Sequence, residues 1–204
     1  MHKPAVNDYP IHDLLQTRWS PRAFDPERDI DTATLASLFE AARWAPSSFN
    51  EQPWAFLVAS RSDRVSFDRL LDCLMPGNRA WAEYAPILIA GLAKNTVERN
   101  GKPNRYAWYD LGQAVSMLTV EATAHGLWLH QMAGFDADAV RRAHDVPEGW
   151  DPVVTIALGH QATSTDHLPE KLRDVEKAPR KRKPLDAFVF SGQFGDSAPW
   201  TRDG

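Results

Sequence analysis

The stretch YAWYDLGQAVSMLTVEATAHG (residues 106–126) decides the fold of this chain. Its apolar residues recur at helical spacing and form one stripe: Leu111, Ala114, Val115, Leu118 and Ala122. Gly126 follows the last turn, where glycine commonly ends a helix. Because the other faces also carry apolar residues, the pattern predicts a helix over about 106–125 that is buried on most sides. The neighbours that cover it come from the same chain or from another subunit.

Apolar runs on either side of this helix predict a sheet. Residues 54–60, 86–93, 127–132 and 152–159 are expected to be strands, and the last suits a sheet covered on both faces. Polar and amphipathic segments between them predict helices over 10–18, 32–45, 61–74, 136–146 and 169–178, with Asp31 as the N-cap of the second. With no repeat and no long linker, we expect one α/β domain of mixed order with helices flanking the sheet.

The composition narrows the class of protein. The chain has 204 residues, of which 43% are hydrophobic and 25% charged, as in soluble globular proteins. No segment resembles a signal peptide or reaches membrane-spanning length, so we expect a cytoplasmic protein. The formal net charge of −4 argues against a general nucleic-acid binder. Any site for an anion must therefore be local.

Several common kinds of site are absent from the sequence. No two glycines are spaced as in a dinucleotide fingerprint, and neither a phosphate loop nor a nucleophilic-serine motif is present. His125 and His130 do not share a helical face, so no metal site is expected. The single cysteine, Cys73, excludes an internal disulfide framework and is predicted to be an inert thiol buried in a helix.

The sequence RWSPR (residues 18–22) places Arg18, Ser20 and Arg22 at alternate positions. Pro21 disfavours the helical conformation for Ser20, so this backbone is expected to be extended. Alternate side chains of extended backbone share a face. Two guanidinium groups and a hydroxyl on one face suit a phosphate or a carboxylate. The alternative is a solvated N-terminal turn.

Three further polar elements are candidates for binding. PSSFNEQP (46–53) offers hydroxyls and amides that can read the rim of a heteroaromatic ring, or that merely end a helix. MAGFD (132–136) places Gly134 between a strand and a helix, where backbone can approach a ligand closely. RKRK (180–183) is a solvated face, a localisation signal or part of an anion site.

In their order along the chain these elements resemble the flavin-dependent nitroreductase family. The resemblance rests on RWSPRAF, APSSFNEQPW, YDLGQAVSMLTVEATAHGL, MAGFD and RKRKPLDAFVFSGQFG, and it covers about residues 11–195. It implies an α+β, nitroreductase-like fold in a single domain over 1–204, with a central mixed, mainly antiparallel sheet flanked by helices. It also implies an intertwined homodimer with FMN bound at the interface. The chain is similar as well to the iodotyrosine-deiodinase and flavin-cleaving branches of the superfamily.

The same resemblance implies roles for residues. The phosphate and ribityl end of FMN would be held by Arg18, Ser20, Arg22, Arg180 and Arg182, and Trp19 stands where Arg or His is common. The partner chain would contact the isoalloxazine and ribityl groups with its polar loop, Pro46, Ser47, Ser48, Asn50 and Gln52. The backbone of Ala133 and Gly134 would lie near flavin N5. Ala133 also replaces an acid of some members. Candidate substrate contacts are Arg105, Tyr106 and Trp108.

The implied activity is that of an FMN-dependent oxidoreductase. NADH or NADPH gives hydride to flavin N5, and a nitroaromatic, quinone or similar flat acceptor is then reduced at the same place in a ping-pong cycle. No side chain need be a covalent catalyst, and Arg22 is the candidate cation near flavin N1 and O2. The alternatives are a specialised branch, either a reductive dehalogenase or a flavin-modifying enzyme, a non-catalytic flavin-binding protein, and a nucleic-acid-binding module that uses RKRK.

Overall fold

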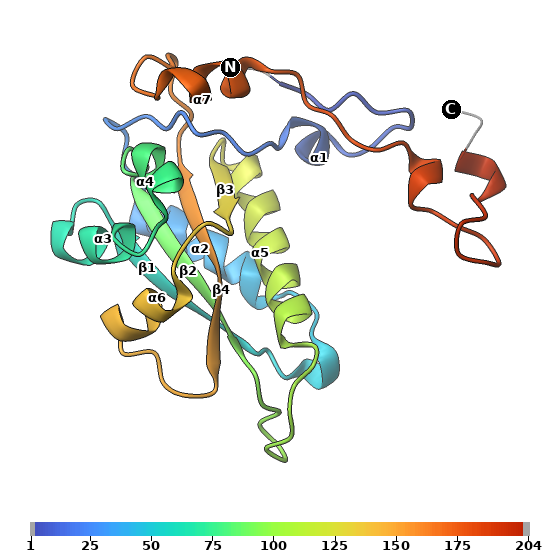
Figure 1. The fold of residues 1–204 in the computed structure, drawn as a ribbon, viewed down its shortest axis with the longest axis horizontal. Helices are drawn as coiled ribbons and strands as arrows, with labels where there is room; N and C mark the ends of the chain where they lie inside the picture. The colour runs from blue at the N-terminus through green and yellow to red at the C-terminus, as the bar shows by residue number, and fades with distance from the viewer. Residues whose placement is uncertain (1–2, 202–204) are drawn as a thin grey trace.

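A four-stranded antiparallel sheet forms the centre of the protein in a computed structural model that describes residues 3–201. The strand order is β1-β2-β4-β3, and all three pairings of this sheet are antiparallel (Figure 1). The strands are β1 (Trp54–Ser60), β2 (Ile87–Lys94), β3 (Trp128–Met132) and β4 (Trp150–Gly159). The four predicted strands are thus confirmed, as is a mainly antiparallel sheet. The outer bounds of the expected domain, 1–204, lie outside the described residues.

Helices cover both faces of the sheet (Figure 1). Because strand side chains alternate, Ile87 and Ile89 of β2 point to one face while Leu88 and Ala90 point to the other. The first face packs against α2 (Thr32–Arg43) and α5 (Ala107–Ala124). The second packs against α3 (Arg64–Leu71), α4 (Pro76–Ala82) and α6 (Ala137–Ala143). The two clusters make a three-layer core.

The long helix α5 is placed as its apolar stripe predicts. Leu111, Ala114, Val115, Leu118 and Ala122 are all at most 1% exposed, and Gly126 adopts φ +68 at the helix end. The opposite face is uncovered within this chain, since Gly112 and Ser116 are exposed and Met117 is 43% exposed. Burial on most sides is therefore not achieved by one protomer.

Several local boundaries differ from the sequence predictions; α2 and α6, for example, end two and three residues earlier than predicted. Helix α3 begins only at Arg64 because the Asp63 side chain caps it, and it ends at Leu71. Cys73 consequently lies after the helix, where it is buried, and burial raises the pKa of its thiol. Helix α4, whose first residue is Pro76, was not predicted. The predicted helix over 10–18 is reduced to α1 (Asp13–Thr17).

The two ends of the chain run together along one end of the sheet (Figure 1). After β4, the chain passes beside residues 22–25, with hydrogen bonds from Asp25 N–H to His160 O (2.9 Å) and from Ala162 N–H to Ala23 O (2.8 Å). It then forms α7 (Glu170–Lys177) and the 3₁₀ turns η2 (Leu185–Ala187) and η3 (Pro199–Thr201). The third such turn, η1 (Ser48–Asn50), lies between α2 and β1.

None of the helices within residues 3–201 combines the length and the apolar character needed to cross a membrane.

Gly159, the last residue of β4, permits the close approach of residues 22–25. A Cβ at this position would lie 2.5 Å from Cδ of Pro86 and 3.0 Å from Cδ1 of Phe24, and Phe24 is fully buried. Because these neighbours are ring atoms in the core, they have little freedom to move aside.

We therefore predict that Gly159→Ala lowers the free energy of unfolding by about 1–3 kcal/mol, since a methyl group overpacks this site. Gly77→Ala, in α4, is the matched control because a Cβ there meets nothing within 4 Å, and alanine is the better helix former. The measurement is equilibrium denaturation in urea. Equal midpoints for Gly159→Ala and the parent would show that the close approach is not tight.

Candidate anion-binding site

Both ends of the chain contribute to one pocket of about 360 Å³. The structure brings together residues from the two basic elements that the sequence singled out, together with Lys3, which was not predicted. The lining residues are Lys3, Arg18, Trp19, Ser20, Arg22, Val175, Ala178, Pro179, Arg180 and Arg182. Arg18, Ser20 and Arg22 share this pocket, in agreement with the alternation expected of extended backbone.

The cations of this pocket influence one another electrostatically. Burial lowers the pKa of Arg18 and of Arg180, and the charge of Arg182 lowers both further. Burial also lowers the pKa of Lys3, although Glu176 opposes that shift. Within residues 3–201, none of the five cations of the pocket forms an ion pair with a carboxylate. Because like charges repel one another, a bound anion would stabilise this group of cations. The pocket therefore suits an anionic ligand.

Backbone carbonyls and neighbouring side chains hold several of these cations in place. Arg180 donates from Nη1 to Gln16 O (2.8 Å) and to Lys3 O (3.0 Å). Arg18 Nη1 lies 3.4 Å from Ser20 Oγ. Trp19 is 6% exposed, and Lys3 Nζ lies 4.3 Å from the centre of its ring. Trp19 therefore supports the pocket wall by packing.

Glu176 of α7 fixes the backbone beneath this pocket. Its carboxylate is fully buried and accepts the Arg22 N–H (2.9 Å to Oε1 and 3.1 Å to Oε2) and the Ala23 N–H (3.0 Å to Oε1). The sequence offered no signal for this role, because α7 also carries the exposed acids Glu170 and Asp174. Only the tertiary structure separates one carboxylate of this helix from the others.

His130 of β3 makes a further contact with the same stretch of backbone. Its Nδ1 lies 2.9 Å from Pro21 O, and its ring centre is 4.5 Å from that of Trp81. The Arg22 guanidinium carbon lies 5.9 Å from the centre of the Trp81 ring. Burial lowers the pKa of His130 to about 4; hydrogen bonding to backbone opposes this shift, and Arg22 adds to it. His130 is therefore neutral near pH 7, with its proton on Nδ1 facing the carbonyl.

The predicted polar loop lies elsewhere, next to the first turn of α5. Asp110 Oδ2 accepts the Ser48 N–H (3.1 Å), and Ser47 Oγ accepts the Gln52 N–H (3.0 Å). Burial raises the pKa of Asp110, which is 2% exposed, and the Ser48 hydrogen bond partly offsets this. Phe49, Asn50 and Gln52 all have positive φ, an uncommon conformation that must be held by such contacts.

One protomer does not bring this loop to the anion pocket. The loop contacts the N-terminal turn of α5, whereas α1 and the following residues lie toward the other end of that helix (Figure 1). The 18 residues of α5 span roughly 27 Å. The loop 46–53 and the pocket are thus separate from each other within one chain.

The glycine turn follows directly after β3, the strand that carries His130. After β3, the Gly134 carbonyl accepts hydrogen bonds from Met75 N–H and Asn78 Nδ2, both at 3.0 Å, and a Cβ at Gly134 would lie 2.7 Å from Asn78 Nδ2. Ala133 is exposed. The turn is therefore attached to the strand that supports the anion pocket.

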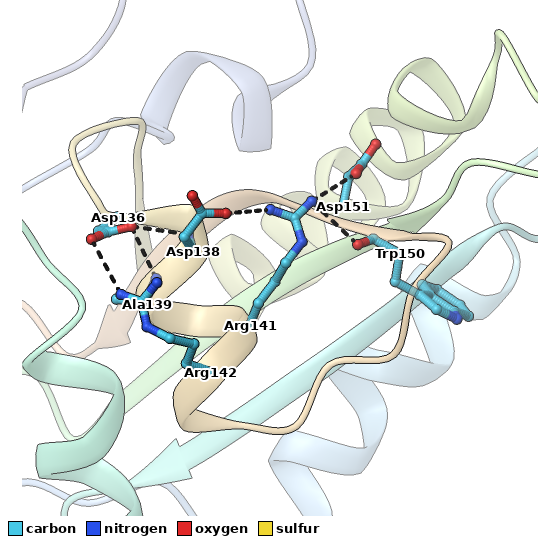
Figure 2. A network of polar contacts seen from close by, with 7 residues as sticks. All are labelled: Asp136, Asp138, Ala139, Arg141, Arg142, Trp150 and Asp151. Carbon is cyan, nitrogen blue, oxygen red and sulfur yellow. Dashed lines mark hydrogen bonds and ion pairs between the residues drawn. The ribbon is translucent and has the colours of Figure 1, made fainter.

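The predicted substrate residues begin α5, beside the polar loop. Tyr106 is 47% exposed and Trp108 58%, and the Arg105 guanidinium carbon lies 5.4 Å from the centre of the Tyr106 ring. Trp108 Nε1 lies 3.3 Å from Asp151 Oδ2. Figure 2 shows that Arg141 of α6 bonds Asp151, at 2.8 Å from its Oδ1, and reaches Asp138 as well. This network connects the start of α5 with the helix that follows the glycine turn.

Comparison with known proteins assigns this arrangement to a family. The protein-family model described as "Nitroreductase family" matches residues 15–160 of this chain. A solved structure described as an oxidoreductase containing FMN has 32% identity and a TM-score of 0.87, over 94% of this chain and 96% of that one. The 5,6-dimethylbenzimidazole synthase of Rhodospirillum rubrum is 30% identical over 72% of this chain and 79% of its own. The major NAD(P)H-flavin oxidoreductase of Aliivibrio fischeri is 44% identical over a shorter stretch, 24% of this chain and 22% of its own.

The depressed pKa of His130 predicts a loss of stability in mild acid. In the unfolded chain the imidazole of His130 has a pKa near 6.5, whereas in the folded protein its pKa is about 4. Between these pH values the unfolded state therefore binds a proton that the folded state does not. The contribution of neutral His130 to the free energy of unfolding is fully present above about pH 6.5 and is lost as the pH falls toward 4. The loss is roughly 2 kcal/mol between pH 7.5 and 5.

The test is urea denaturation of the parent and of His130→Gln at both pH values, since glutamine can donate to Pro21 O but does not titrate. The other histidines with lowered pKa remain in the variant and act as an internal control. We expect the parent to lose about 2 kcal/mol more than the variant on acidification. Equal losses would contradict a buried, neutral His130.

Proposed function

Because the chain belongs to the nitroreductase family, we propose that it is an FMN-dependent oxidoreductase that uses NADH or NADPH to reduce nitroaromatic compounds, quinones or similar flat acceptors. The observation that carries this proposal is a cluster of cations from both chain ends that form no ion pair with a carboxylate of residues 3–201. One similar protein is described as containing FMN and another as an NAD(P)H-flavin oxidoreductase, which supports the choice of cofactor and reductant.

The donors of the pocket fit the phosphate of FMN. Arg18, Arg22, Arg180 and Arg182 carry guanidinium groups, which bind phosphate oxygens through two parallel hydrogen bonds. Each charge-assisted bond stabilises a complex by about 1.5–3 kcal/mol. The phosphate would also relieve the repulsion among these cations, and Ser20 would add a hydroxyl. We therefore assign the phosphate and ribityl end to this pocket.

A second copy of the chain would complete the site. Pro46, Ser47, Ser48, Asn50 and Gln52 cannot approach the pocket of their own protomer, so we propose that they contact the ring and ribityl groups bound by the partner. The uncovered face of α5, with its small and apolar residues, supports an interface of this kind. The proposed assembly is a homodimer with FMN at the interface.

Bound FMN would supply the hydride chemistry, and the chain would supply orientation and charge. We propose that the backbone of Ala133 and Gly134 lies against the reactive part of the ring, and that Arg22 stabilises negative charge on it. Tyr106, Trp108 and Arg105 would contact the nicotinamide and the acceptor, which use the same place in turn. Ala133 would leave this place less polar than the acid that some family members carry there.

A specialised branch of the family is the second candidate. The similarity to 5,6-dimethylbenzimidazole synthase favours a flavin-modifying enzyme as the form of that alternative. Chromatography of the flavin after prolonged turnover distinguishes the two functions. Intact FMN supports the oxidoreductase, whereas stoichiometric conversion of the flavin supports the second candidate.

We predict that the purified protein binds FMN, shows flavin absorption, and bleaches when NADH or NADPH is added without oxygen. A nitroaromatic or quinone added next should restore the colour, with two electrons passed to the acceptor for each NADH or NADPH oxidised. Absorption spectroscopy in an anaerobic cell measures both steps. Protein that takes up no FMN would contradict the cofactor assignment, and bound FMN that NAD(P)H does not bleach would indicate a flavin-binding protein without this activity.

We predict that two inactive variants complement each other if the site is shared. Arg18→Ala removes a phosphate ligand, and Asn50→Gly removes a partner side chain while suiting the positive φ at that position. Each variant alone should bind FMN weakly. Random exchange of equal amounts should restore about a quarter of the sites, because a mixed dimer has one intact site and one doubly altered site.

The measurement is FMN bound per chain after the apoproteins are mixed, and a mixture of each variant with itself is the control. A mixture that never exceeds the separate variants, although exchange is shown to occur, would mean that Arg18 and Asn50 of one chain serve the same site, or that neither contributes to a site.

A further inference from the structure

We propose that Glu176 is a positioning residue of the anion pocket, which acts on the ligand through the backbone of Arg22 and makes α7 part of the phosphate site. This inference rests on the proposed function for the identity of the ligand. Glu176 is not among the residues implied by the family resemblance. Its role follows from three contacts of one buried carboxylate.

Glu176 contacts two separate segments of the chain that line the pocket. Its carboxylate accepts the N–H groups of Arg22 and Ala23 at 2.9–3.1 Å. Its own backbone carbonyl accepts the Lys3 ammonium group at 2.6 Å, and that group lies over the Trp19 ring. One residue of α7 is therefore bonded to the N-terminal arm and to the segment that carries Arg18, Ser20 and Arg22.

The adjoining peptide groups are held as well. The Pro21 carbonyl lies 2.9 Å from His130 Nδ1, and the Ala23 carbonyl accepts the Ala162 N–H at 2.8 Å. The backbone from Pro21 to Ala23 is thus fixed from β3, from α7 and from the segment after β4. A cradle fixed before the ligand arrives avoids the entropy cost of ordering the chain during binding.

The charge of Glu176 makes this role testable. As a plain negative charge beside the pocket, the carboxylate would repel a phosphate, so its removal would tighten binding. As the acceptor that sets the Arg22 backbone, it favours binding, so its removal would weaken binding. The two roles predict changes of opposite sign. A fully buried carboxylate with three close N–H contacts indicates the second role.

The experiment compares Glu176→Gln with Asp174→Asn, which removes the same charge from an exposed position on the same helix. In the glutamine variant, the amide NH₂ replaces one acceptor oxygen and opposes a backbone N–H. Dissociation constants are measured by fluorescence for FMN and for riboflavin, which has the same ring and no phosphate. Inorganic phosphate is the third ligand, and its binding is followed as a shift in thermal unfolding.

We expect Glu176→Gln to weaken FMN by about tenfold or more, and to reduce the shift produced by inorganic phosphate. Riboflavin binding should stay within about twofold of the parent, and Asp174→Asn should leave FMN binding unchanged or slightly tighter. FMN binding that is unchanged or tighter in Glu176→Gln overturns the proposal. Equal weakening of FMN and riboflavin also overturns it, because that result indicates a general structural role.

Two further measurements keep the outcome decisive. If the parent binds inorganic phosphate but no flavin, the proposed function is wrong. The role of Glu176 is then tested by the phosphate-induced shift in thermal unfolding alone. If Glu176→Gln does not fold, amide hydrogen exchange is measured on the ligand-free parent. Slow exchange at the Arg22 and Ala23 amides supports a preformed cradle, whereas rapid exchange at both overturns it.

Discussion

The mutual repulsion of arginine side chains from both ends of the chain is the constraint that the rest of this structure satisfies. Arg18 and Arg22 come from the N-terminal segment, and Arg180 and Arg182 from the C-terminal segment, more than 150 residues later. Like charges at close range oppose the folded state unless other contacts hold them. Here backbone carbonyls hold the Arg180 guanidinium in place, because Gln16 O and Lys3 O accept hydrogen bonds from it. The arginine side chains are thereby left available to an anion.

A buried hydrogen-bond acceptor and a buried donor together stabilise the backbone next to this pocket. Glu176 can only accept hydrogen bonds and receives two backbone N–H groups, while neutral His130 donates to a carbonyl. Each satisfies a group that burial would otherwise leave costly. Because His130 lies on β3 and Glu176 on α7, the pocket is tied both to the central sheet and to the C-terminal segment. The proposed phosphate contacts therefore depend on elements that are distant in sequence.

The length of α5 explains why the proposed cofactor site needs two copies of the chain. This helix holds the polar loop 46–53 at its first turn through Asp110, and the anion pocket lies toward its other end. A rigid element of roughly 27 Å keeps the loop and the pocket apart in one protomer. The same helix leaves a face of small and apolar residues uncovered. Pairing of two chains through such faces would bring the loop of one chain to the pocket of the other, in keeping with the proposed dimer.

The sequence by itself determined the strands, the long helix and the residue types of the candidate site. Periodicity fixes these features locally, since the stripe of α5 and the four apolar runs each form a pattern within one segment. Alternation around Pro21 likewise indicated that Arg18, Ser20 and Arg22 share a face, and the resemblance implied Arg180 and Arg182 as their companions. The assignment of all these residues to FMN remains a proposal.

Only the tertiary structure decided which polar residues support that site. Glu176 resembles its neighbours Glu170 and Asp174 in sequence, and His130 is an ordinary residue of a short strand. Their roles arise from contacts across 154 and 109 positions of the chain, which no local pattern encodes. The boundaries of α3 and the presence of α4 were missed for a related reason, because caps and packing override the propensity of short segments.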